Sequence, residues 1–199
     1  MIGDVRYPAK IFQLWSTSEL NAIGIYEVVF DDSNKKDEKW YINTNQSYDF
    51  ADNAVTASYG DATPKAHADT LWTQDEINDG DAPEGVSPGD IKTRGLKYNL
   101  IQTLKLQVAG ILSDTDWYIT RNTEKSTAIP SAISTHRDAV RTKQAEMETA
   151  ITNASDTPAL ETLYIFVNTA TKTVDGVEVE DKDNPVIERP LGELPTLEI

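Results

Sequence analysis

The sequence predicts an α+β protein whose strands and helices occupy different parts of the chain. Short runs rich in β-branched and aromatic residues fill the first third, and apolar residues recur at helical spacing in the middle. An Asp-Gly hairpin signal follows near the C-terminus. We therefore expect four segments. These are a small β-rich module with one short helix (1–68), an acidic linker (69–92), a two-helix hairpin (93–154), and a β-hairpin with an extended acidic arm (155–199).

Charge and composition exclude several classes of protein. The 199 residues carry 18 Lys and Arg against 33 Asp and Glu, a net charge of −15, which repels phosphate backbones and anionic lipids. We therefore expect neither nucleic acid nor a membrane as partner. The sequence has no long apolar run and its first residues do not resemble a signal peptide. The chain contains no Cys, so disulfides and thiolate metal sites are excluded.

The first module should begin with a short helix. Ser16 and Glu19 have the spacing of a capping box, in which each side chain binds the backbone amide of the other residue. Gly24 follows where a helix would end, because glycine readily adopts the left-handed conformation of a C-terminal cap. We expect one helix between these positions.

Four runs of the first module have strand character: residues 25–30, 39–42, 47–50 and 55–59. We interpret the first two as a hairpin joined by the polar stretch 31–38. That stretch has oxygen-bearing side chains at alternate positions, as calcium loops do, but it lacks the glycine and glutamate that such loops require. We interpret it as a solvated loop.

The segment 69–92 has no periodicity and is dominated by Pro, Gly and acidic residues. This composition is typical of a linker or a long irregular loop. Its net charge of −6 predicts that it stays extended and solvated.

Helical periodicity begins after residue 91. One apolar stripe comprises Ile101, Leu104, Val108, Ile111 and Leu112, and a second comprises Ile133, Val140, Met147 and Ile151. Pro130 suits the start of the second helix. Gly95 and Gly110 each weaken the first helix by roughly 1 kcal/mol relative to Ala, so it needs a packing partner. We expect a helical hairpin whose two helices are separated by residues 114–129.

The last segment combines strand and arm signals. Residues 163–167 are consecutive apolar and aromatic residues, which favours a strand, and Asp175-Gly176 predicts a type I′ turn. Pro185, Pro190 and Pro195 then prevent regular structure, so the chain should end as an extended arm.

Catalytic chemistry is not indicated. The sequence lacks a glycine-rich phosphate loop, a nucleophile elbow and a recognisable pair of catalytic carboxylates. His67 and His136 are the only histidines, and we interpret His136 as a satisfied or surface side chain. We therefore expect no catalytic residue, no metal and no cofactor. An enzyme that acts on cell-wall polysaccharide remains an alternative without a supporting motif.

Trp117 lies between the two expected helices and has two interpretations. In the first, the indole closes the open end of the hairpin as part of its core, beside a turn capped by Asp114 or Asp116. In the second, Trp117 and Tyr118 are exposed anchors for a partner, because aromatic side chains with a polar group are common in binding sites.

Three stretches of the central segment resemble a known family: residues 112–121 (LSDTDWYITR), 128–130 (AIP) and 136–141 (HRDAVR). Their order and spacing resemble the pattern L…TDW…R…IP…YR…VR, which marks the phage tail assembly chaperone-like domain of tailed bacteriophages. His136 stands where that family more often has Tyr or Trp. The N-terminal stretch Tyr7-Pro8-Ala9, followed by residues 16–25, also resembles the opening of many such phage proteins.

The resemblance implies a bacteriophage protein made in the host cytoplasm. We expect a virion structural or adaptor protein of the tail, baseplate or fibre-attachment region, oligomeric within an assembly and in contact with other tail, baseplate or fibre proteins. The alternative is a non-virion chaperone of tail or tail-fibre assembly.

Five residues are the expected contacts with a partner: Trp117, Tyr118, Arg121, Arg137 and Arg141. The last two are four residues apart and therefore share one helix face. They either bind an acidic segment of the partner or form internal ion pairs with Asp114 or Asp116.

Overall fold

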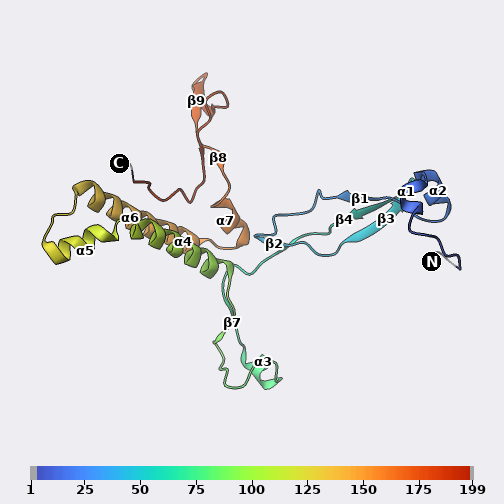
Figure 1. Ribbon diagram of the computed structural model, residues 1–199, viewed down its shortest axis with the longest axis horizontal. Helices are drawn as coiled ribbons and strands as arrows, with labels where there is room; N and C mark the ends of the chain where they lie inside the picture. The colour runs from blue at the N-terminus through green and yellow to red at the C-terminus, as the bar shows by residue number, and fades with distance from the viewer. Residues whose placement is uncertain (1–3, 198–199) are drawn as a thin grey trace. The chain divides into compact units, whose positions relative to one another are not determined.

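The computed structural model describes residues 4–197 and confirms the α+β class. The chain divides into two compact units, the first ending at Pro64 and the second beginning at Lys65. This boundary lies four residues before the expected one at 68. The second unit includes the expected linker, helical hairpin and C-terminal segment, which therefore belong to one unit (Figure 1).

The first unit begins with two short helices, α1 (Ile11–Leu14) and α2 (Thr17–Ala22), where one was expected. The capping box of α2 is confirmed: the Ser16 amide donates to Glu19 Oε2 (2.8 Å) and the Glu19 amide donates to Ser16 Oγ (3.4 Å). Gly24 has a φ of +83°. The helix therefore ends in a Schellman motif, with the Ile25 amide on the Leu20 carbonyl (3.0 Å).

Three strands of the first unit form a sheet of order β1-β4-β3: β1 (Val28–Asp31), β4 (Ala54–Ser58) and β3 (Ser47–Ala51). β1 runs parallel to β4, and β3 runs antiparallel to it. A separate pair joins β2 (Tyr41–Ile42) to β5 (Thr63–Pro64). The expected hairpin between residues 25–30 and 39–42 is therefore wrong, because β4 takes the place beside β1.

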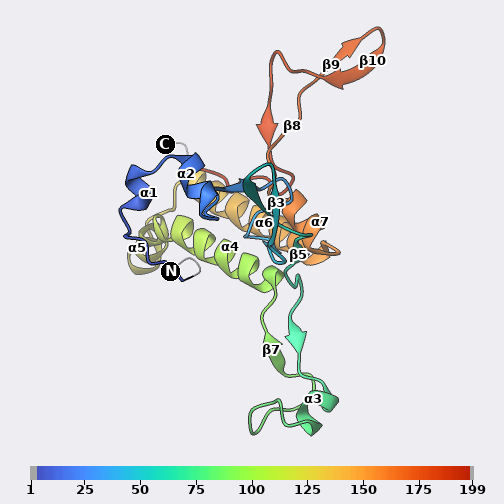
Figure 2. The same ribbon diagram turned by 90° about the vertical axis from the view of Figure 1, so that its right-hand side faces the viewer.

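The second unit opens with a small lobe where we expected an irregular linker. β6 (Thr70–Leu71) pairs with β7 (Ile91–Thr93), and α3 (Gln74–Asn78) lies between them in sequence. Figures 1 and 2 show this lobe extending from the start of the long helix α4. The linker expectation is wrong because Thr73 and Glu76 form a capping box, and Glu76 Oε1 binds Lys92 Nζ (2.5 Å). These contacts tie α3 to β7.

Two long antiparallel helices form the core of the second unit: α4 (Leu96–Ser113) and α6 (Ser131–Asn153). Leu104 and Val108 of α4 are buried, and the buried apolar residues of α6 are Ile133, Val140, Met147 and Ile151. The two apolar stripes are thus confirmed as packing faces. The segment between the helices differs from the expected turn, because it contains a third helix, α5 (Asp116–Lys125).

Helix α7 (Thr157–Thr162) follows α6 and ends just before the strand expected at residues 163–167, most of which is turn or irregular chain. Asp156 caps it by accepting the Ala159 amide (2.8 Å). The strand prediction is wrong because Leu163 still has helical dihedral angles, and only Val167–Asn168 (β8) forms a strand. Thr157 and Leu160 are buried, and the Thr157 hydroxyl donates to the Lys65 carbonyl (2.6 Å), which fixes α7 to the start of the unit.

The C-terminal hairpin is confirmed. β9 (Thr171–Val174) pairs with β10 (Val177–Glu180), and the turn between them has positive φ at Asp175 (51°) and Gly176 (82°). β11 (Ile187–Glu188) then pairs with β8. The expectation that the prolines prevent regular structure from Pro185 onward is therefore wrong in part, because β11 lies within that stretch. The described residues 191–197 form no helix or strand, as expected of the arm.

Candidate partner-binding site

Arg137 stabilises the end of the helical hairpin at which α4 connects to α5. Its guanidinium donates through Nη1 to the Leu112 carbonyl (2.7 Å) and to Thr115 Oγ1 (2.6 Å). Nη2 donates to Asp116 Oδ1 (2.8 Å). The internal ion pair of Arg137 is thus confirmed, with Asp116 as its partner. One side chain of α6 therefore binds the end of α4, the following turn and the first residue of α5.

Thr115 completes this arrangement from within the turn. It is 3% exposed, and its hydroxyl donates to the Leu112 carbonyl (3.1 Å) while accepting from Arg137. Arg137 Nε is buried and has no hydrogen-bond partner in the described part of the chain. Such an unpaired donor is costly, so the other three contacts of the guanidinium have to offset its desolvation.

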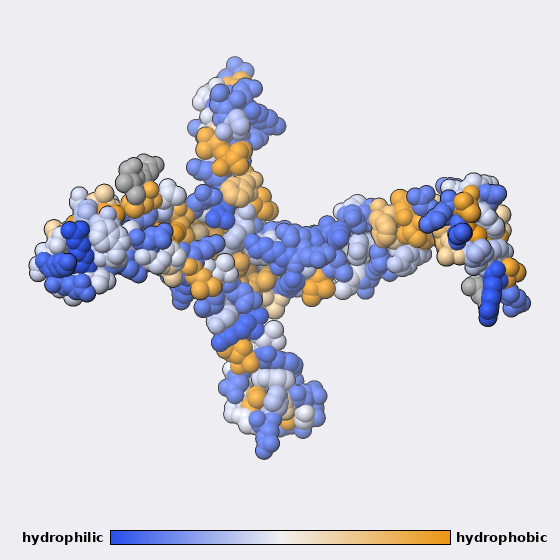
Figure 3. Space-filling view, in the orientation of Figure 1, coloured by the Kyte–Doolittle hydropathy of each residue, from blue (hydrophilic) through white to orange (hydrophobic). Residues whose placement is uncertain are grey.

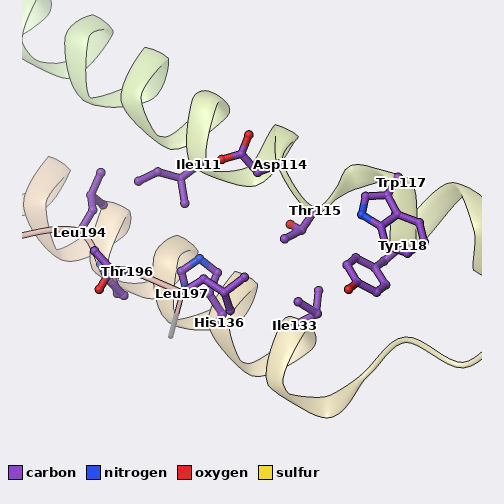
Figure 4. Close-up of a pocket in the computed structure, with 11 residues that line it drawn as sticks. Ile111, Asp114, Thr115, Trp117, Tyr118, Ile133, His136, Leu194, Thr196 and Leu197 are labelled. Carbon is purple, nitrogen blue, oxygen red and sulfur yellow. The ribbon is translucent and has the colours of Figure 1, made fainter. Parts of the chain in front are cut away.

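A cavity of about 490 Å³ lies beside this ion pair. Its walls come from α4 and the following turn, from α5, from α6 and from the C-terminal arm (Figure 4). The lining residues are Ile111, Asp114, Thr115, Trp117, Tyr118, Ile133, His136, Leu194, Pro195, Thr196 and Leu197. Apolar and aromatic walls with a few polar groups are typical of binding sites.

Trp117 and Tyr118 form an aromatic pair at one side of the cavity. Their ring centroids lie 3.8 Å apart at an interplanar angle of 30°. Trp117 is 51% exposed, so its interpretation as a core residue that closes the hairpin is wrong. The hairpin end is closed by the Arg137 contacts instead, which leaves the indole free to line the cavity.

The C-terminal arm forms the opposite wall. Leu191 is buried, and its amide donates to the Leu163 carbonyl (3.0 Å). Gly192 follows with a φ of +70°, and its amide donates to the Arg189 carbonyl (2.8 Å). From this turn the chain continues to Leu197 beside His136, as Figure 4 shows.

Two of the five expected contact residues line the cavity, namely Trp117 and Tyr118. The Arg121 guanidinium lies 5.8 Å from the Trp117 ring centroid, so this side chain extends the aromatic surface. Arg137 is buried beneath the cavity and Arg141 pairs with Asp138 on the exposed side of α6 (3.4 Å). The two arginines therefore differ in environment although they are four residues apart.

Sequence reasoning missed two parts of this site. The sequence did not place His136 in a site, but it is 8% exposed and lines the cavity. Its spacing of three residues from Ile133 and four from Val140 puts it on the same buried face of α6 and could have indicated this. Residues 194–197 of the arm were missed because their contact with α6 joins distant parts of the chain.

Metal and membrane sites were also sought among the described residues. No group of three or more His, Asp or Glu side chains in residues 4–197 is arranged to hold a metal ion. No helix within that range combines the length and the apolar character needed to cross a bilayer.

Comparison of the chain with protein-family models, with curated proteins and with solved structures found no match.

Proposed function

We propose that this chain is a non-catalytic structural or adaptor protein of a tailed-bacteriophage virion, in the tail, baseplate or fibre-attachment region. The resemblance of residues 112–141 to the phage tail assembly chaperone-like family supplies the biological setting. The observation that carries the proposal is the large apolar surface that the first unit leaves uncovered.

That surface is one face of the sheet β1-β4-β3. The strand register places Phe30 and Tyr48 on either side of Ala57, and Val28 and Phe50 on either side of Val55. We call these six side chains the apolar sheet face. The opposite face carries mostly polar side chains, such as Asp49 and Thr56.

The apolar sheet face is largely open to solvent (Figure 3). Phe30 is 65% exposed, Tyr48 63% and Phe50 53%, whereas Ala57 between them is fully buried. Among the described residues of the first unit, the buried apolar side chains are Ile11, Trp40, Tyr41 and Ala57. So small a core is a weak source of stability, and an exposed apolar sheet favours association with another protein.

Association inside an assembly also suits the charge of the chain. The net charge of −15 opposes aggregation of free molecules through long-range repulsion. Apolar contact at the sheet face is short-ranged and gains free energy only when a complementary neighbour covers it. A virion protein that is soluble before assembly and ordered by its neighbours needs both properties.

Mass spectrometry of purified particles tests this proposal. The phage that encodes the chain should be compared with a derivative in which its gene is deleted, grown in parallel. We expect the chain in wild-type particles at a constant ratio to a tail protein, and tails that are incomplete in the deletion. Absence of the chain from mature particles would contradict a virion role.

The same two phages, with co-purification from infected cells added as a measurement, also test for assembly chaperone activity. A chaperone would be absent from particles but would co-purify with a tail or fibre protein from infected cells before assembly. A deletion that leaves both the protein content and the form of the tails unchanged would contradict both functions.

A further inference from the structure

The C-terminal arm covers one side of the cavity in a way that favours replacement by another chain. Residues 194–197, Leu-Pro-Thr-Leu, form one wall of it. No hydrogen bond in the described part of the chain holds residues 193–197, whereas Leu191 and Gly192 are both held by backbone bonds. The arm beyond Gly192 is therefore retained by side-chain packing alone.

That packing is incomplete. A cavity of about 490 Å³ persists with the arm in place, and Trp117 remains half exposed. Because the cavity is partly open to solvent, the arm leaves much of its aromatic and apolar lining uncovered. A longer or bulkier segment would gain contacts that the arm does not make.

The chemistry of the arm identifies the kind of segment that fits. It is extended, and two leucines flank Pro195-Thr196. Proline-containing extended segments commonly dock on aromatic grooves, because their backbone is already ordered and loses little entropy on binding. The Trp117–Tyr118 pair supplies such an aromatic surface.

We propose that this cavity is a docking site for an extended, proline-containing aliphatic segment of a partner protein, and that the C-terminal arm covers part of the site as an internal competitor. The partner displaces residues 193–197, while Leu191 and Gly192 keep the start of the arm in place. The arm thus protects the apolar walls before the partner arrives. This inference does not depend on the tail assignment.

A fluorescently labelled peptide of residues 190–197 serves as the probe, with anisotropy as the measurement on the full chain. The double substitution Leu194→Asp and Leu197→Asp should release the arm. If the arm occupies the site about nine-tenths of the time, release raises the apparent affinity for the peptide about tenfold. Leu106→Asp is the matched control, because Leu106 is 75% exposed on α4 and does not line the cavity.

A second substitution tests whether the peptide binds in the cavity. On the released-arm chain, Trp117→Ala should weaken peptide binding about tenfold, whereas Ile119→Ala should not, because Ile119 lies on the same helix outside the cavity. A peptide with Pro195→Ala should also bind more weakly. Leu194→Ser provides a milder release variant, and far-UV circular dichroism confirms that each variant keeps its helices.

Three results would overturn the proposal. Equal affinity of the wild-type and released-arm chains would show that the arm does not compete. Unchanged affinity after Trp117→Ala would place the peptide elsewhere. A wild-type dimer that the arm substitutions convert to a monomer, measured by light scattering, would mean that the occupant is the arm of a second copy.

Discussion

Arg137 is the residue on which the geometry of the helical hairpin depends most. Three hydrogen bonds join its guanidinium to Leu112, Thr115 and Asp116, and its side chain is 8% exposed. Asp116 itself is largely exposed, so solvent screens the ion pair and reduces its share of the stability. The bonds to the Leu112 carbonyl and the Thr115 hydroxyl are therefore the greater part of what Arg137 contributes.

Arg137→Ala should lower the free energy of unfolding by about 2–3 kcal/mol, because it removes the packing of a buried side chain and its charged hydrogen bonds to the Leu112 carbonyl and the Thr115 hydroxyl. Urea unfolding followed at 222 nm measures the change. Arg141→Ala is the matched control, since Arg141 is half exposed and pairs only with Asp138; we expect a change within about 0.5 kcal/mol. Equal losses in the two variants would contradict the structural role of Arg137.

Trp117 should contribute little to stability despite its size. Because the residue is 51% exposed, Trp117→Ala should lower the free energy of unfolding by less than about 1 kcal/mol. The loss for a core aromatic residue is typically about 3–5 kcal/mol. Ile151→Ala is the comparison: this fully buried side chain should cost about 2–5 kcal/mol. Thermal or urea unfolding of the two variants tests the contrast. A large loss of stability in Trp117→Ala would show that the indole is part of the core.

At the scale of the element, the start of α4 depends on a close backbone approach. A Cβ atom at Gly95 would lie 2.3 Å from the Ala68 carbonyl carbon and 2.4 Å from its oxygen. Asp69 accepts the Gly95 amide (2.7 Å) and the Arg94 guanidinium (2.6 Å). These contacts, led by the amide, lower the pKa of Asp69. The helix start and the preceding strand segment therefore form one local unit.

Gly95→Ala should destabilise the protein by about 1–3 kcal/mol, because the methyl group would displace backbone atoms. Gly110→Ala on the same helix should instead stabilise it by about 0.5–1 kcal/mol, since a Cβ there meets nothing within 4 Å. Opposite shifts of the urea midpoint are the expected result. A stabilising effect at both positions would contradict the close approach at Gly95.

The small lobe β6–α3–β7 should loosen in acid. The Lys92 ammonium, followed by the Thr73 amide and hydroxyl, lowers the pKa of Glu76 from 4.5 to about 2. Because the folded pKa is the lower one, these contacts contribute fully above pH 4.5, and their contribution is lost as the pH falls from 4.5 toward 2.

An NMR titration of the Glu76 carboxyl carbon measures this directly, and its midpoint should lie near pH 2. Lys92→Met removes the leading cause and should move the midpoint toward 4.5. The protection factors of the α3 amides, which correct for the intrinsic slowing of exchange in acid, should fall over the same range of pH. A wild-type midpoint at the ordinary glutamate value would mean that the Glu76–Lys92 pair does not persist in solution.

At the scale of the whole molecule, the chain combines a strong negative charge with large exposed apolar surfaces. The apolar sheet face is one of these surfaces in the first unit, with Phe30 and Tyr48 each more than 60% exposed. Folding of this unit gains little from those side chains. Their contribution comes when a neighbour covers them.

The double substitution Phe30→Ser and Tyr48→Ser should therefore reduce binding of an apolar dye and incorporation into particles, while the free energy of unfolding changes by less than about 1 kcal/mol. Val29→Ser is the matched control, because Val29 is 51% exposed on the opposite face of β1. Fluorescence titration and particle mass spectrometry are the measurements. A large loss of stability would instead identify the sheet face as part of the core.

Much of the local structure could be predicted from the sequence. The capping box at Ser16 and Glu19, the turn at Asp175-Gly176 and the apolar stripes of α4 and α6 are all confirmed. The pairing of Arg137 with Asp116 was one of two stated alternatives. The first three features depend on residues a few positions apart or on a single periodic pattern, whereas Arg137 and Asp116 are 21 positions apart in the sequence.

Other features depend on contacts between segments that are far apart in the sequence. β4 rather than residues 39–42 lies beside β1, because its register brings Val55 and Ala57 between the aromatic side chains of the sheet. The segment 69–92 folds because Lys92 reaches Glu76, and the arm covers the cavity because Leu191 is fixed to Leu163.

The sequence by itself determined the start and end of α2 and the apolar faces of α4 and α6, since these depend on the spacing of residues along one helix. It did not indicate α1, α3, α5 or α7. The tertiary structure decided which strands pair and which side chains line the cavity at Trp117. Those outcomes depend on how well surfaces from distant parts of the chain fit together, and a local sequence pattern does not predict that fit.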